Sequence, residues 1–184
     1  MSPAIDLTDD QFFAFCQQNR DYHIERSANG EIIIMPPTGS ETRNRNFDLI
    51  VQLGIWTRQN GTGIGFDSSA GFTLPNGAIK SSDAAWIRLP KWNSLTREQQ
   101  QKFAPICPDF VVELRSPSDN LQPLKDKLQE YIDNGTSLGL LIDRQSRKVY
   151  IYRPNSEVEC LDNPDTVNCD PVLPGFVLDL ESIW

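Results

Sequence analysis

Histidine and cysteine are scarce in this chain of 184 residues: His23 is the one histidine, and the four cysteines are Cys16, Cys107, Cys160 and Cys169. Zinc sites use these two residue types at close spacing, and the sequence has no Cys-x-x-Cys pair, so we expect no zinc site. Cys160 and Cys169 could be bridged in an oxidising setting, which nothing else in the sequence implies. We therefore expect four reduced thiols, most of them packed in the interior.

Long apolar runs are also lacking. No stretch is long enough to cross a bilayer, and residues 1–7 do not join a basic region to an apolar one as a secretory signal does. We expect a soluble cytoplasmic protein with no membrane partner. Because 39% of the residues are apolar and no linker-like Gly/Ser run occurs, residues 1–184 are expected to form a single domain.

Positive charge is in short supply, since 17 Lys and Arg against 25 Asp and Glu give a net charge of −8. Binding to phosphates is driven largely by Lys and Arg, so this balance argues against a protein that coats nucleic acid non-specifically. A nuclease with a local basic cleft stays possible. The sequence also lacks the Gly-x-Gly-x-x-Gly, Gly-x-x-x-x-Gly-Lys-Ser/Thr and Gly-x-Ser-x-Gly motifs, so nucleotide cradling and serine hydrolase chemistry have no support.

The pattern of apolar and turn-forming residues predicts a mixed α/β domain with a mixed sheet, not a doubly wound one. Helices are predicted over residues 8–19, 40–59, 96–102 and 121–134. The apolar residues at helical spacing in the second of these are Phe47, Ile50, Val51, Gly54 and Ile55. Strands are predicted over residues 22–26, 31–35 (ended by the proline-containing segment 35–39), 65–67, 71–74, 83–87, 109–114, 138–142 and 148–152.

Two acidic residues and one lysine carry the chemical hypothesis. Asp83 opens an apolar stretch, and Glu113 ends a near-continuous apolar run that suits a central strand covered on both faces. Each carboxylate could give one oxygen to Mg²⁺ or Mn²⁺, and the backbone carbonyl of Leu114 could give another. Water bound to such a metal becomes acidic enough to attack phosphorus. Lys127 could orient that water or neutralise charge on the phosphoryl oxygens.

Each of these residues also has an ordinary structural interpretation. Asp83 could begin a strand at the solvent edge, and Glu113 could be a strand-end carboxylate paired with Arg115. Taken singly, these interpretations are the commoner ones. The pairing of the two acids favours a site, because burying a lone carboxylate costs several kcal/mol and Glu113 directly follows a run of core residues.

The lysine and a possible third acid are not fixed by periodicity. Lys125 and Lys127 flank the apolar face of the 121–134 helix on opposite sides, so either could bend toward the strand ends or lie in solvent. Glu41 lies in the first turn of the 40–59 helix, where it favours the helix N-terminus electrostatically. Alternatively, Glu41 is a third acidic group near the metal.

Several segments together resemble the Uma-type endonucleases, a family of the restriction-endonuclease-like PD-(D/E)XK superfamily. The resemblance extends from about residue 12 to residue 180. Its most specific part is Glu-Leu-Arg-Ser-Pro-Ser with a lysine downstream. The segments that carry it are residues 34–39, 82–86, 108–118, 127–131 and 141–143.

The resemblance implies a mixed sheet flanked by helices, with Asp83 as the first motif aspartate and Glu113 as the second acidic position. Arg115 stands where the superfamily has its lysine, and the family's Lys-x-x-x-Tyr spacing on the next helix points to Lys127. The residue before the aspartate is serine, where the pattern often has proline. The match also suggests Glu41 as a further member of the acidic cluster.

Three functional hypotheses follow. The first is a metal-dependent endonuclease that hydrolyses DNA, using Asp83, Glu113 and Lys127 with Glu41 as an accessory. Cleavage of both strands would normally need two active sites, so a homodimer is plausible. The second is a nuclease-derived binding module without catalysis, and the third is an α/β scaffold whose charged residues form structural ion pairs. A fold alone does not decide among them.

Overall fold

A mixed sheet forms the centre of the molecule. The computed structural model describes residues 7–35 and 39–184, and within them the largest sheet has six strands in the order β10-β9-β8-β7-β6-β3. Strands β7 and β8 are parallel, and the other neighbours are antiparallel, which confirms the predicted mixed sheet. We call this the large sheet. Its strands are β3 (Gly63–Asp67), β6 (Ala84–Arg88), β7 (Phe110–Leu114), β8 (Leu138–Asp143), β9 (Lys148–Tyr152) and β10 (Glu159–Asp162).

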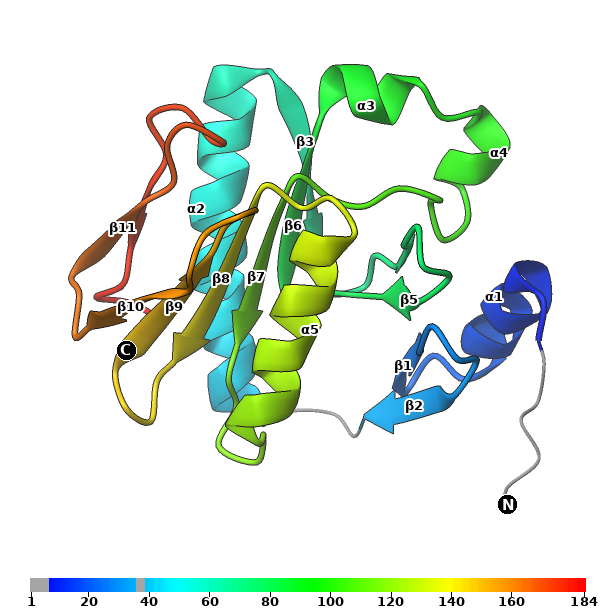
Figure 1. Cartoon of the computed structure of the whole chain (residues 1–184), viewed down its shortest axis with the longest axis horizontal. Coiled ribbons are helices and arrows are strands. Elements are labelled where there is room, and N and C mark those ends of the chain that lie inside the picture. The colour runs from blue at the N-terminus through cyan, green and yellow to red at the C-terminus, as the bar shows by residue number, and fades with distance from the viewer. Residues whose placement is uncertain (1–6, 36–38) are drawn as a thin grey trace.

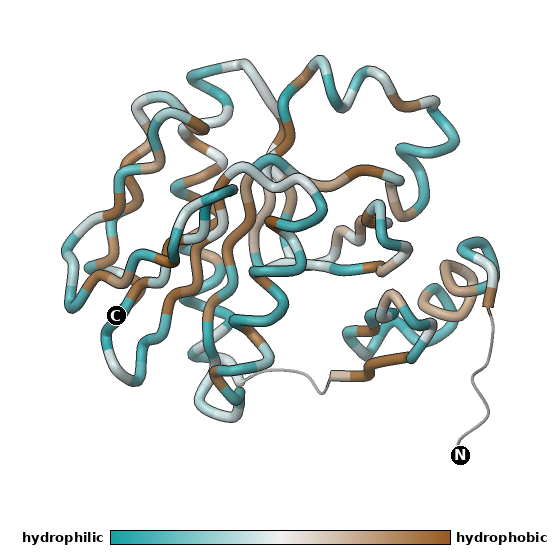
Figure 2. The backbone as a smooth tube through the Cα atoms, viewed as in Figure 1, coloured by the Kyte–Doolittle hydropathy of each residue, from teal (hydrophilic) through white to brown (hydrophobic). Residues whose placement is uncertain are grey.

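Helices cover both faces of the large sheet (Figure 1). Helix α5 (Leu121–Asp133) makes the crossover between parallel strands β7 and β8 and packs on one face. Helix α2 (Ser40–Asn60) packs on the other, with the small sheet of β11 (Thr166–Asn168) and β12 (Val177–Asp179). Alternate residues of the central strands therefore enter different cores, and most residues of these strands are hydrophobic (Figure 2).

A second sheet lies beside the large one and carries the N-terminal hairpin. Its order is β2-β1-β5-β4, and we call it the hairpin sheet. Phe12 packs against it from α1, where the Thr8 side chain caps the helix. The strands predicted over residues 22–26 and 31–35 pair as a hairpin, with Gly30 at a φ of 83° in its turn. The elements are α1 (Asp9–Gln18), β1 (His23–Arg26), β2 (Ile32–Met35), β4 (Phe72–Thr73) and β5 (Ile79–Lys80).

Several boundaries differ from the sequence-based expectation. Asp83 lies just before strand β6 instead of opening it, and β6 is an interior strand, so Asp83 does not begin an edge strand. The short helix α3 (Leu89–Asn93) and strand β5 were not predicted, because each is too short to show periodicity. Helix α4 (Arg97–Gln100) begins with a capping box at Thr96 and is shorter than predicted. The segment expected to end the second strand lies mostly outside the described residues, as do residues 1–6.

The apolar residues that predicted helix α2 face the core only in part: Ile50 packs against it, but others of the set do not. Leu49 and Leu53 are buried, whereas Phe47, Val51 and Ile55 are exposed by 64%, 38% and 54%. Both sets recur four residues apart, so each forms a stripe along the helix. The two stripes lie about 200° apart around the axis, and only one of them can face the sheet.

The four cysteines were expected to be reduced and mostly packed in the interior. All four thiols are free, as predicted, but Cys107 and Cys169 alone are fully buried, and Cys160 is exposed. Burial raises the pKa of Cys169 to about 12. Among residues 7–35 and 39–184, no helix is both long and apolar enough to span a membrane.

Candidate active site

Strand pairing brings Asp83 and Glu113 together. Strands β6 and β7 are antiparallel with Ala84 opposite Val112, so the next pair in this register is Asp83 with Glu113. The backbone N–H of Leu114 donates to Asp83 Oδ2 over 2.7 Å. Because side chains alternate along a strand, Glu113 shares the face of Val111, which belongs to the α5 side of the large sheet. Glu113 is buried, and Asp83 keeps partial exposure.

Helix α5 supplies Lys127 to these carboxylates. Its Nζ lies 2.8 Å from Glu113 Oε1 and donates to the backbone carbonyl of Ser81 over 2.6 Å. Lys125 instead places its ammonium 4.0 Å from the centroid of the Tyr150 ring. The structure thus brings Lys127, and not Lys125, to the strand ends, as the family spacing suggested.

Glu25 of strand β1 joins the same group and was missed by the sequence analysis. Its Oε1 lies 2.8 Å from Lys127 Nζ, and its Oε2 lies 3.5 Å from Lys80 Nζ. The backbone N–H of Ser81 also donates to Oε1, over 3.2 Å. In the sequence, Glu25 resembles any carboxylate of a short hairpin strand, and its lysine partners are far along the chain. We call Glu25, Lys80, Asp83, Glu113 and Lys127 the buried charge cluster.

Asn46 connects helix α2 to the cluster and was also missed. Its Nδ2 donates to Asp83 Oδ1 over 2.7 Å, which turns its Oδ1 away from Asp83. Among the described residues, Asn46 Oδ1 is buried with no hydrogen-bond partner. Glu113 Oε1 is similar: the Lys127 ammonium lies close to it, but outside good hydrogen-bonding geometry. Within the described part of the chain, two buried oxygens on residues next to Asp83 therefore lack a hydrogen-bond donor.

Burial and mutual charge perturb the acids of the cluster. Burial raises the pKa of Glu113 to about 8 despite the charge of Lys127, and the charges of Asp83 and Glu25 add to the rise. Burial also raises the pKa of Asp83 against the hydrogen bonds from Leu114 and Asn46. These two carboxyl groups resist carrying negative charge together, which is the condition that a bound cation relieves.

Glu25 and Lys127 behave in the opposite way, because their neighbours favour the charged form. Burial alone would raise the pKa of Glu25, but the charges of Lys127 and Lys80 and a contact with His23 hold it well below its ordinary value. Burial likewise favours the neutral amine of Lys127, yet Glu113 and Glu25 hold its pKa well above the ordinary value. Glu25 is therefore a carboxylate, and Lys127 an ammonium, across the physiological pH range.

Two sequence-based interpretations of neighbouring residues are corrected. Arg115 does not pair with Glu113, because its Nη1 lies 3.0 Å from both carboxylate oxygens of Asp143. Glu41 lies in the first turn of α2 as predicted, but it is an exposed partner of Arg144, at 2.6 Å. Among the described residues, no ion pair or hydrogen bond joins Glu41 to the buried charge cluster.

The oxygen atoms of the cluster suit a hard divalent cation. Mg²⁺ usually takes one or two protein carboxylates and keeps several waters or substrate phosphates. Asp83 and Glu113 provide that number of carboxylates, and Asn46 Oδ1 is a buried oxygen in need of a partner. Across residues 7–35 and 39–184, no group of three or more His, Cys, Asp or Glu side chains is placed to hold a metal ion, so these two carboxylates are the acidic ligands that the site offers.

A mixed sheet between helices, with acids at the ends of two adjacent strands, is the arrangement of restriction-endonuclease-like nucleases. The family model Uma2, described as "Putative restriction endonuclease", matches residues 9–181, and the chain belongs to this family. A crystal structure with this fold is that of "a putative nuclease belonging to DUF820" from Anabaena variabilis. It has 21% identity and a TM-score of 0.73, covering 87% of this chain and 88% of that chain. No curated protein matches the sequence.

Proposed function

We propose that this protein is a metal-dependent endonuclease that hydrolyses DNA phosphodiester bonds. The observation that carries the proposal is the meeting of Asp83, Glu113 and Lys127 from three separate elements. Membership of a nuclease family supports the reaction class, and DNA as substrate is part of the proposal. The net charge of −8 makes a local cation at the site important, because the rest of the surface repels a polyanion.

The residues of the cluster divide the work by their chemistry. Asp83 and Glu113 would hold Mg²⁺ or Mn²⁺, with Asn46 Oδ1 and the Leu114 carbonyl as further oxygen ligands. The bound ion lowers the pKa of water and polarises phosphoryl oxygens. Lys127 adds a fixed positive charge where negative charge develops on the phosphate. Its ammonium is already held by Ser81, Glu25 and Glu113, so little reorganisation is needed during the reaction.

Cleavage of plasmid DNA tests this proposal. Purified protein is incubated with supercoiled plasmid in Mn²⁺, Mg²⁺ or chelator, beside Asp83→Asn and Glu113→Gln. We expect metal-dependent nicking that either variant reduces at least about 100-fold, because each removes a charge at the reacting centre. Lys125→Ala is the matched control, since Lys125 lies on the same helix but faces Tyr150. Equal cleavage by wild type and both acidic variants would reveal contamination and refute the assignment.

The oligomeric state is a finer part of the proposal. Duplex cleavage in both strands needs two sites, so we propose a homodimer, which sedimentation equilibrium on DNA tests directly.

The alternative function is a nuclease-fold binding module that does not cleave. Its support is that both oxygens of Asp83 already accept hydrogen bonds from the protein, as in a purely structural carboxylate. DNA binding that persists in Asp83→Asn, with no cleavage by wild type in either metal, would favour it.

A further inference from the structure

We propose that Glu25 is a positioning residue for Lys127: from the hairpin sheet, it fixes the lysine ammonium against Glu113 of the large sheet. The inference rests on the proposed function, because it concerns how the same site is built. It makes the hairpin sheet a part of the active site instead of a separate appendage. Glu25 lies 58 residues before Asp83 in the sequence, since 83 − 25 = 58.

The ammonium of Lys127 sits between two carboxylates that belong to different sheets. Glu25 Oε1 and Glu113 Oε1 each lie 2.8 Å from its Nζ, and the carbonyl of Ser81 accepts a hydrogen bond from it. An ammonium carries three hydrogens, and three protein oxygens lie within 2.8 Å of this one. A lysine side chain is long and flexible, and this arrangement leaves it one position.

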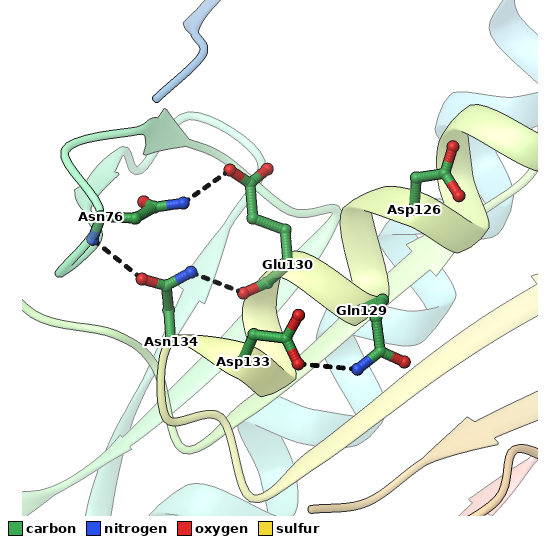
Figure 3. A pocket seen from close by; sticks show the side chains of 6 residues that line it. All are labelled: Asn76, Asp126, Gln129, Glu130, Asp133 and Asn134. Atoms are coloured by element: carbon green, nitrogen blue, oxygen red, sulfur yellow. Dashed lines mark hydrogen bonds between the residues drawn. The ribbon is translucent and has the colours of Figure 1, made fainter. Parts of the chain in front are cut away.

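Glu25 is itself held from its other side. Glu25 is 3% exposed, and its carboxylate is paired with Lys80, whose Nζ lies 3.5 Å away. Lys80 Nζ also lies 3.3 Å from Glu130 Oε2. Glu130 in turn accepts from the amide of Asn76 at the edge of a surface hollow at the end of α5 (Figure 3). The alternating charges Glu130, Lys80, Glu25 and Lys127 therefore form one connected row that ends at Glu113.

Replacing Glu25 should make the Lys127 side chain more mobile but leave it in the site. Lys127 would keep Glu113 and the Ser81 carbonyl, so a neutral glutamine at position 25 leaves it paired but free to rotate. A Lys127 ammonium that pairs with Glu113 as its one remaining carboxylate would compete with a cation for that carboxylate. The expected effect is on the rate of the chemical step and not on DNA affinity, because Glu25 is too buried to touch a substrate.

The test compares Glu25→Gln with Glu130→Gln, a matched variant that removes a carboxylate from the same row but does not contact Lys127. We expect Glu25→Gln to lower kcat about 10- to 100-fold with KM within about threefold, and Glu130→Gln to leave both within about threefold. Equal losses in the two variants would assign Glu25 a structural role and overturn the inference. Glu25→Asp keeps the charge but shortens the side chain, and it takes the place of Glu25→Gln in this comparison of kcat and KM if Glu25→Gln does not fold.

A second readout does not depend on cleavage. The ammonium nitrogen of Lys127 gives a lysine resonance in ¹⁵N NMR, which Lys127→Arg identifies by removing it. We expect this resonance to be sharp in wild type and Glu130→Gln, and to broaden by solvent exchange in Glu25→Gln. An unchanged resonance in Glu25→Gln would overturn the positioning role. If wild type cleaves no DNA, the proposed function fails while this spectrum still decides the role of Glu25.

Discussion

Replacing Glu113 by glutamine should change how the stability of the cation-free protein depends on pH. Burial raises the pKa of Glu113 to about 8 in the folded state, against 4.5 for an ordinary glutamate. Between these pH values, the folded protein keeps a proton that the unfolded chain has released. The free energy of unfolding therefore falls as pH rises through this window.

The size of the fall follows from the difference between the two pKa values. That difference is 8 − 4.5 = 3.5 units. At about 1.4 kcal/mol per unit, the upper limit is roughly 5 kcal/mol, fully reached only above the folded-state pKa. Asp83 adds to the fall, because its pKa is raised as well. Glu25 acts in a different pH range: because its pKa is lowered, it stabilises the folded protein at pH values above the ordinary glutamate pKa of 4.5. That contribution is lost progressively as the pH falls below this value.

Urea unfolding with chelator present, at about pH 5.5 and about pH 8.5, measures the effect. We expect wild type to lose roughly 2–5 kcal/mol across this interval and Glu113→Gln to lose much less, so that the variant is the more stable protein at the higher pH. Lys125→Ala serves as control and should follow wild type. A pH dependence in Glu113→Gln as steep as that of wild type would refute the reasoning.

Three further predictions concern the surroundings of the site. Arg115→Ala leaves the buried carboxylate of Asp143 without its cation and should cost about 3 kcal/mol in urea unfolding. Gly63→Ala places a Cβ 2.2 Å from the Trp86 ring, so the free energy of unfolding should fall by about 1–3 kcal/mol, which thermal unfolding shows as a lower melting temperature. Glu41→Gln should leave the plasmid cleavage rate unchanged, because Glu41 pairs with Arg144 at the surface. A loss as large as that in Asp83→Asn or Glu113→Gln would show that Glu41 belongs to the active site.

The strand that carries Glu113 could be predicted from the sequence because its physics is local. An apolar run covered on both faces needs no knowledge of its neighbours. The pairing of Asp83 with Glu113 needed the register of two strands joined by a long connection, which no local pattern fixes. The choice of Lys127 over Lys125 came from the family spacing, because both lysines flank the apolar face of α5 equally.

Other features could not be predicted because the deciding contacts are remote. Glu25 takes its role from Lys127, which lies 102 residues later since 127 − 25 = 102. Asn46 is one amide among several polar residues of α2 until Asp83 is placed beside it. On the same helix, two apolar stripes compete, and only the tertiary structure shows that Leu49 and Leu53 face the sheet.

The most direct test of the account is the affinity of the site for a cation. Calorimetric titration of Mn²⁺ into the metal-free protein should show a specific site, and Asp83→Asn should weaken binding at least about tenfold, because it removes a charged oxygen ligand. Binding by Asp83→Asn as tight as that of wild type would place the cation elsewhere. No binding by wild type at millimolar Mn²⁺ or Mg²⁺ would reduce the cluster to a set of structural ion pairs and contradict the proposed chemistry.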